Sequence, residues 1–223
     1  MIFLFDEKAG ENPLFIRGEN FKYLVKVRRH TTGDVLHFRN PSNPEILYSY
    51  TVESLTPREL NLILTDWKKE NVSPLKQLHI GWCMIDPKSI EKTLPMLNEI
   101  GVTKISFIYC KRSQRNFKPD PKRFERILKS SMQQCGRSSF LHFEIHNTLQ
   151  EFLELYPDVR VFDFCENVLE GENELKTVLI GCEGGFSEEE RILLKEKETF
   201  RLDTPMVLRS ESAAVAVASK ILL

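Results

Sequence analysis

The spacing of apolar residues changes near residue 70, and this change constrains the fold of the 223-residue chain more than any other feature. Before it, the stretches MIFLF, DVLHF, EILYSYTVESL and ELNLILTDW have the pattern of β-strands, with one short helix expected over 19–29. After it, strands alternate with helices. The polar stretch KKENVSPLK separates the two patterns. We therefore expect a small β domain over 1–72 and an α/β domain over 73–223.

The second region alternates in a way that is typical of a parallel sheet. Strands are expected in QLHIGWCMI, KISFIYC, LHFEIH, VRVFDFC and TVLIG. Between them, IEKTLPMLNEI reads as a helix that Gly101 ends, and PKRFERILKSSMQQC reads as another. Parallel α/β sheets bind their ligands at the carboxyl ends of the strands, so the segments that follow these strands are the candidate site.

A glycine turn follows the strand TVLIG, in the sequence VLIGCEGGFSEEE over 178–190. Gly181, Gly184 and Gly185 let the backbone turn sharply and approach a ligand closely. Ser187 and Glu190 have the spacing of a capping box that opens a helix. Three glutamates in that first turn disfavour a bound phosphate, and the GxGxxG spacing of a dinucleotide loop is absent. S-adenosylmethionine has no phosphate and carries a cation, so it fits; an ordinary strand–turn–helix is the alternative.

The last segment, LDTPMVLRSESAAVAVASKILL, places Arg209 and Glu211 at the start of a helix rich in serine and alanine. Small side chains over 210–219 permit close approach of another backbone. A plain C-terminal helix packed on the sheet would explain the small residues, but it leaves the charged pair unexplained.

Charge is distributed unevenly although the formal net charge is −1. Residues 73–150 contain thirteen basic and six acidic residues, whereas 151–223 contain eight basic and sixteen acidic residues. This asymmetry favours contact with a polyanion through the basic region, with a solvated protein face as the alternative. The densest basic window is 104–137, in which Lys111, Arg112 and Arg115 follow a strand.

Several classes of protein are disfavoured. No apolar stretch approaches the length of a membrane helix, and the N-terminus lacks the features of a secretory signal, so no membrane partner is expected. Five widely spaced cysteines without a CxxC pair indicate reduced thiols in a cytoplasmic protein. His142 and His146 share one face of an expected strand but have no third ligand, so no metal site is expected.

Five motifs in order resemble the RsmE-type 16S rRNA uridine-N3 methyltransferases. They are YLVKVRRHTTGD over 23–34, NEIGVTKISFIYCKRS over 98–113, QQCGR over 133–137, EGGFS from 183 and LRSESA over 208–213. That family belongs to the SPOUT class. The resemblance implies an α/β fold with a SPOUT-type parallel sheet and a C-terminal trefoil knot, preceded by a small PUA-like β-barrel domain. It also implies an enzyme that binds S-adenosylmethionine, 16S rRNA of the small ribosomal subunit and a second copy of itself.

The resemblance assigns roles to individual residues. Arg209 would stabilise the uridine anion formed when N3 loses its proton, and Glu211 would position Arg209 or accept that proton. RNA contacts are expected from Arg28, Arg29, Lys111, Arg112, Arg115 and Arg137. Cofactor contacts are expected from Cys165, Glu166, Ile180, Gly181, Gly184, Gly185, Leu202, Val207, Leu208, Ser212 and Ala213.

The chain departs from the family pattern at a few positions. Cys182 replaces a usual proline, Ser212 a usual threonine, Thr204 a usual glycine and Met206 a usual arginine. Arg209, Glu211 and the glycines remain, so we expect activity. The alternatives are an RNA-binding or ribosome-assembly factor on a retained methyltransferase fold, and an NAD-dependent dehydrogenase.

Overall fold

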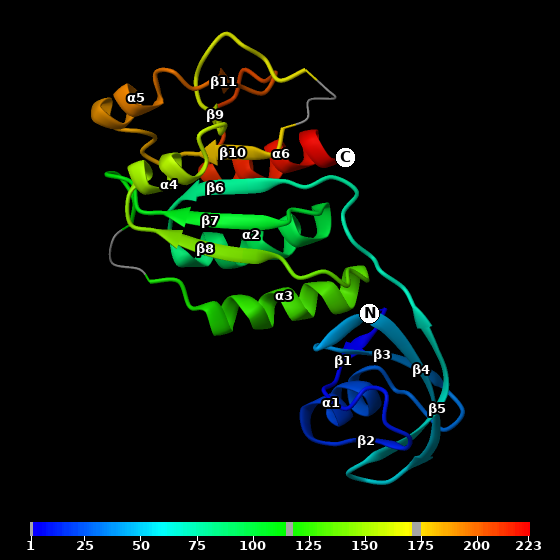
Figure 1. Ribbon diagram of the computed structural model, residues 1–223. Coiled ribbons are helices and arrows are strands. Elements are labelled where there is room, and N and C mark those ends of the chain that lie inside the picture. Colours follow the sequence, from blue (N-terminus) through cyan, green and yellow to red (C-terminus); the bar gives the residue numbers. More distant parts are fainter. Residues whose placement is uncertain (1, 115–117, 171–174) are drawn as a thin grey trace. The chain divides into compact units, whose positions relative to one another are not determined.

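The computed structural model describes residues 2–114, 118–170 and 175–223, and they form two compact units (Figure 1). Unit 1 comprises Met1–Ser73 and Met132–Ser139, and unit 2 comprises Pro74–Ser131 and Phe140–Leu223. Residues 132–139, which the sequence placed with the α/β domain, group with unit 1.

Unit 1 is a five-stranded sheet in the order β1-β3-β4-β5-β2. Its strands are β1 (Leu4–Phe5), β2 (Leu14–Ile16), β3 (Val35–Asn40), β4 (Asn43–Leu55) and β5 (Leu60–Lys69). β1 pairs with β3 in parallel and the other neighbours are antiparallel. The three-residue β2 was not predicted, because its apolar run is too short to show alternation. β5 extends to Lys69, into the stretch that the sequence assigned to a linker.

The helical segment of unit 1 differs from the expected single helix over 19–29. α1 (Gly18–Lys22) continues into a π-helical turn, η1 (Tyr23–Val27), and Arg29 then takes a left-handed backbone conformation with φ 62°. Phe21 and Leu24 of this segment pack with Phe38 and Tyr50 of the sheet.

Unit 2 is built on a six-stranded sheet in the order β11-β9-β10-β6-β7-β8, and every neighbouring pair is parallel. The strands are β6 (His79–Cys83), β7 (Lys104–Ile108), β8 (His142–His146), β9 (Arg160–Phe162), β10 (Thr177–Ile180) and β11 (Thr199–Phe200). The predicted parallel α/β sheet is confirmed, whereas the two-residue β11 was not anticipated. The chain runs outward from β6 to β8 and then returns to β9 and β10 on the other side, so β6 and β10 mark a topological switch point.

Within the described part of unit 2 there are five helices, one of which extends into unit 1: α2 (Pro87–Ile100), α3 (Pro121–Cys135), α4 (Leu149–Leu155), α5 (Glu188–Leu194) and α6 (Ser210–Leu222). Asp86 caps α2 by accepting hydrogen bonds from the amides of Lys88 and Ser89, so the helix begins three residues before the expected start at Ile90. Gly101 ends it at φ 111°, as the sequence predicted. α6 packs beside α2 and against β10 (Figure 1). No helix in the described ranges is both long and apolar enough to span a bilayer.

Candidate cofactor and RNA site

A cavity of about 710 Å³ lies in unit 2 where β9 and β10 end. Its lining comes from 162–164 after β9, 180–186 after β10, and 201–202 and 204–210 before α6, together with Arg191 and Ala213. All strands of the sheet are parallel, so these separate segments meet at the edge where the topology changes direction. This is where the sequence led us to expect a ligand.

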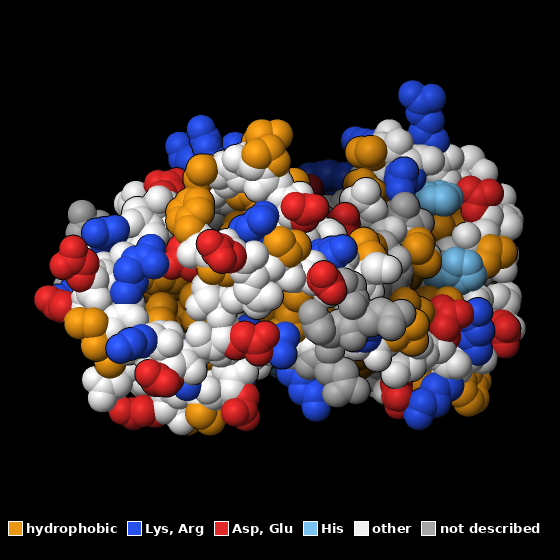
Figure 2. All heavy atoms as spheres, turned by 90° about the horizontal axis from the view of Figure 1, so that it is seen from above, with side chains coloured by type: hydrophobic (Ala, Val, Ile, Leu, Met, Phe, Trp, Pro, Cys, Tyr) orange, Lys and Arg blue, Asp and Glu red, His pale blue; other side chains and the backbone are white. Residues whose placement is uncertain are grey.

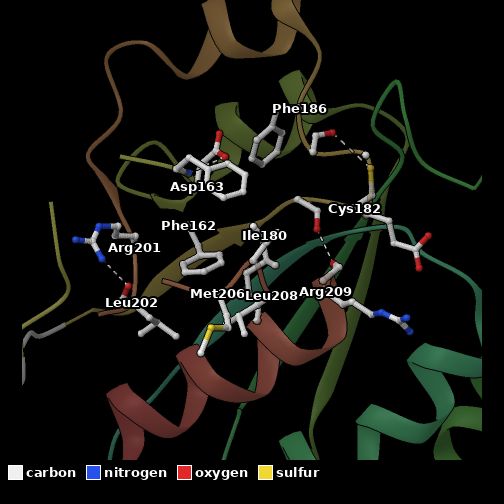
Figure 3. Close-up of a pocket in the computed structure, with 18 of the residues that line it drawn as sticks. Phe162, Asp163, Ile180, Cys182, Phe186, Arg201, Leu202, Met206, Leu208 and Arg209 are labelled. Atoms are coloured by element: carbon white, nitrogen blue, oxygen red, sulfur yellow. Dashed lines mark hydrogen bonds between the residues drawn. The ribbon is translucent and has the colours of Figure 1, made fainter. Parts of the chain in front are cut away.

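The walls of this cavity are mainly apolar. Figure 3 shows Phe162, Ile180, Leu202 and Leu208 gathered around one space, with Met206 beside them. Cys182 adds to the apolar lining, because burial raises the pKa of its thiol and keeps it neutral. Such a slot accepts a flat aromatic group better than a charged one.

The glycine turn is shaped by two different constraints. Gly185 has φ 64°, a conformation that favours glycine, and its amide donates to the Cys182 carbonyl at 2.9 Å. A Cβ on Gly184 would lie 3.2 Å from Cδ of Arg112, so this glycine makes room for the arginine. A side chain of the same protein, Arg112, therefore lies close to Gly184, where the sequence suggested the close approach of a ligand.

The capping box predicted at the start of α5 is confirmed. The Ser187 hydroxyl accepts from the Glu190 amide at 3.2 Å, and the Glu190 carboxylate accepts from the Ser187 amide at 2.8 Å. Two amides at this helix start are thus already occupied, one by the Glu190 carboxylate and one by the Ser187 hydroxyl. This favours a ligand without phosphate.

Ser210, which the sequence analysis overlooked, ties α6 to the sheet. Its hydroxyl donates to the Gly181 carbonyl at 2.5 Å and accepts from Nε1 of Trp82 at 2.8 Å. Ser210 is 5% exposed and Trp82 is fully buried. The position of Ser210 directly after Arg209 could have drawn attention to it, but nothing in the sequence indicated that it bonds Gly181 and Trp82.

Arg209 and Glu211, the residues that the sequence suggests for catalysis, lie at the start of α6. Arg209 is the N-cap residue, exposed to solvent and part of the cavity lining. Glu211 is half-buried and is not part of the lining; its Oε2 is buried and finds no hydrogen-bond partner among the described residues. Ser212 also lies outside the lining, whereas Ala213 is part of it.

The residues after β9 require a correction. β9 ends at Phe162, earlier than VRVFDFC suggested, so 162–164 line the cavity in place of Cys165 and Glu166. Glu166 instead borders a separate hollow of about 570 Å³. Within the main cavity, Asp163 pairs with Arg191 of α5 at 2.6 Å.

The turn before α6 tolerates the departures from the family pattern. Among the described residues, Arg29 alone outside glycine has a positive φ, so Thr204 occupies its position without that strain. The Thr204 hydroxyl also accepts from the Met206 amide at 3.2 Å. Met206 is 67% exposed at the cavity.

Two of the expected RNA-contacting residues are engaged with the glycine turn. Arg112 donates from Nη1 to the Gly184 carbonyl at 2.6 Å, and the Lys111 amide donates to Glu190 at 2.6 Å. Lys111 also forms an ion pair with Glu189. The basic and acidic regions of the sequence are therefore in contact here, through Lys111 and Arg112.

The remaining expected RNA contacts have different surroundings. Arg28 and Arg29 are exposed in unit 1, and Arg28 lies 5.7 Å from the Tyr23 ring. Arg137 is only 5% exposed and donates from Nε to the Ser139 carbonyl, and burial lowers its pKa to about 10. Arg137 is thus a structural residue of unit 1 and is not an exposed phosphate ligand. Arg115 lies outside the described residues.

Basic side chains are interspersed with acidic ones over the face shown in Figure 2. Two basic residues of the window 104–137 form ion pairs with acidic residues of α2 and α3: Arg123 with Glu91 at 2.5 Å, and Lys129 with Glu125 at 2.8 Å. The charge asymmetry of the sequence is therefore partly balanced locally.

Comparisons with known proteins agree with this geometry. Residues 71–222 match the RNA methyltransferase domain family. A ribosomal RNA small subunit methyltransferase E from Helicobacter pylori is 40% identical over an alignment 223 positions long that covers 98% of each chain. A putative methyltransferase from Legionella pneumophila, solved with bound S-adenosylmethionine, has a TM-score of 0.78 at 19% identity and covers 98% of this chain and 95% of its own. A ribosomal RNA small subunit methyltransferase E from Neisseria gonorrhoeae, also bound to S-adenosylmethionine, has a TM-score of 0.77 at 15% identity, with coverage of 98% and 95%. These structural matches show a shared fold.

Proposed function

Because the chain belongs to the RNA methyltransferase family, and within it to the ribosomal RNA small subunit methyltransferases E, we propose that it methylates N3 of a uridine in 16S rRNA. It is an S-adenosylmethionine-dependent ribosomal RNA methyltransferase. The observation that carries the uridine chemistry is the position of Arg209, an exposed cation at the mouth of an apolar cavity.

The cavity fits the chemistry of S-adenosylmethionine. Ile180, Leu202 and Leu208 supply apolar walls for an adenine ring. The glycine turn brings backbone groups to the cavity, and the capping box disfavours a phosphate ligand, which this cofactor lacks. When bound, the cofactor supplies an electrophilic methyl group on a sulfonium centre.

Arg209 and Glu211 are then the residues that act on the uridine. N3 must lose a proton before it attacks, and the guanidinium of Arg209 stabilises the resulting anion through charge and hydrogen bonding. Glu211 lies two residues further along α6, with one buried carboxylate oxygen that has no hydrogen-bond partner in the described ranges. An acceptor of this kind suits either orientation of Arg209 or removal of the proton.

Several finer properties belong to the same proposal. The segment 201–210 enters α6 beside Gly181 and Trp82, which supports threading of the C-terminal chain as a trefoil knot. The curled five-stranded sheet of unit 1 supports a PUA-like RNA-binding domain that presents Arg28 and Arg29. We further propose that the protein acts as a homodimer in the cytoplasm on the small ribosomal subunit.

Mapping methylated nucleotides tests the function directly. In a strain lacking this protein, mass spectrometry of 16S rRNA should show that one N3-methyluridine has lost its methyl group. Wild-type protein should restore this methylation and Arg209→Ala should not. Calorimetry with S-adenosylmethionine should give saturable binding. Binding of RNA without cofactor binding, together with an unchanged methylation map, would favour the non-catalytic assembly factor instead.

A further inference from the structure

We propose that Arg112 is a positioning residue that holds the glycine turn of the cofactor site in its working conformation. The inference rests on the proposed function, because it takes the turn to be part of the cofactor site. Arg112 is exposed and lies outside the cavity lining. Its effect on the cofactor is therefore indirect.

The first observation is the contact between Arg112 and Gly184. The guanidinium donates to the Gly184 carbonyl at 2.6 Å, while the aliphatic part of the side chain covers the Gly184 Cα so closely that an added Cβ would lie 3.2 Å from Cδ and 3.3 Å from Cβ. A charge-assisted hydrogen bond and a close packing contact thus act on the same residue of the turn.

The second observation is a buried carboxylate that fixes the backbone beside Arg112. Glu190 is 5% exposed, and its two oxygens accept from the amides of Lys111 and Ser187 at 2.6 and 2.8 Å. Glu190 therefore joins the segment that follows β7 to the start of α5. We call the set Lys111, Arg112, Gly184 and Glu190 the clasp.

The turn needs such a clasp because its sequence does not select one conformation. Glycine populates positive and negative φ about equally, and Gly185 sits at φ 64° next to a second glycine. The hydrogen bond to the Gly184 carbonyl fixes the peptide plane between Gly184 and Gly185. Ordering the turn before the ligand arrives removes an entropy cost from binding.

Calorimetric titration with S-adenosylmethionine tests the clasp. Arg112→Ala should weaken binding about ten-fold, the effect of losing one hydrogen bond from a charged donor. Arg112→Lys retains a donor and should stay within about three-fold of wild type. The KM for the cofactor should rise more in Arg112→Ala than in Arg112→Lys.

Arg123→Ala is the matched control, because it removes the same charge from the same basic window but from an ion pair with Glu91. Its cofactor affinity should equal that of wild type. Gly184→Ala should weaken cofactor binding in wild type and should have a smaller effect in Arg112→Ala, because the 3.2 Å contact with Cδ disappears while the 3.3 Å contact with Cβ remains. Equal affinity of Arg112→Ala and wild type for the cofactor would overturn the proposal.

A measurement without cofactor separates this proposal from the proposed function. The Gly185 amide donates within the turn, and its hydrogen exchange should be about ten-fold faster in cofactor-free Arg112→Ala than in wild type. If wild type fails to bind S-adenosylmethionine, the proposed function is wrong, and the exchange rate still decides whether Arg112 holds the turn. An unchanged exchange rate refutes the clasp.

Discussion

Replacing Ser210 with alanine should destabilise the protein because the buried Trp82 indole loses its hydrogen-bond acceptor. The Trp82 indole N–H donates to the Ser210 hydroxyl at 2.8 Å, and Trp82 is fully buried. In Ser210→Ala this N–H has no acceptor and no access to water. Leaving a buried donor unpaired costs about 1–3 kcal/mol. The Gly181 carbonyl also loses its 2.5 Å partner, but Gly181 is only half-buried and water can replace that bond.

We therefore expect Ser210→Ala to lower the free energy of unfolding by about 2 kcal/mol. For a protein of this size, that corresponds to a melting temperature roughly 4–8 °C lower. Urea denaturation followed by tryptophan fluorescence measures the first quantity, and calorimetry measures the second. Ser219→Ala, a change to a partly exposed serine of the same helix, should stay within about 0.5 kcal/mol of wild type.

A double-mutant cycle isolates the Trp82–Ser210 hydrogen bond. Trp82→Phe removes the donor, so Ser210→Ala in that background leaves no donor unpaired. It should then lower the free energy of unfolding by about 1–2 kcal/mol less than it does in wild type. Additive effects of the two substitutions, or a Ser210→Ala protein as stable as wild type, would show that the hydrogen bond contributes nothing measurable.

Three further predictions concern activity, pH and RNA. Arg209→Ala should keep stability within about 1 kcal/mol of wild type and lower single-turnover methylation roughly 10²–10³-fold; a loss of only a few-fold would exclude the proposed role. Burial lowers the pKa of His79 to about 4, so on acidification the unfolded state takes up a proton before the folded state does. The free energy of unfolding, measured by urea denaturation, should therefore fall by about 2 kcal/mol or less from pH 7 to 5. His79→Gln should lose this pH dependence and the exposed His142→Gln should keep it. Replacing Lys122 and Arg126, exposed on one face of α3, with glutamine should reduce the salt dependence of RNA binding without changing cofactor affinity; an unchanged salt slope places the RNA elsewhere.

Sequence reasoning succeeded where local signals are strong. Gly101 ends α2 as predicted, because a left-handed conformation is a property of a single residue type, whereas the Asp86 cap at the start of the helix was not predicted. The Ser187–Glu190 box follows from spacing alone. The parallel order of the strands follows from their alternation with helices. β2 and β11 were missed because two or three residues show no periodicity.

The site was harder to predict because its residues meet through the sheet topology. Nothing near Arg137 in sequence indicates that it is buried. β9 ends three residues earlier than expected, which moves the lining from Cys165 to Phe162. Arg112 and Gly184 are 72 residues apart and meet only because the segments after β7 and β10 reach the same edge of the sheet. The sequence described the charge of Arg112 but did not indicate its contact with Gly184.

The glycine turn is held from two sides by residues that the ligand does not need to contact. Ser210 binds the Gly181 carbonyl and Arg112 binds the Gly184 carbonyl, so two acceptors of a short turn are already hydrogen-bonded within the protein. Because Ser210 follows Arg209 directly, the hydroxyl that fixes the turn also fixes the start of the helix that carries the proposed catalytic cation. One short stretch of α6 thereby sets the distance between the cofactor turn and the arginine, which a methyl transfer between two bound molecules requires to be constant.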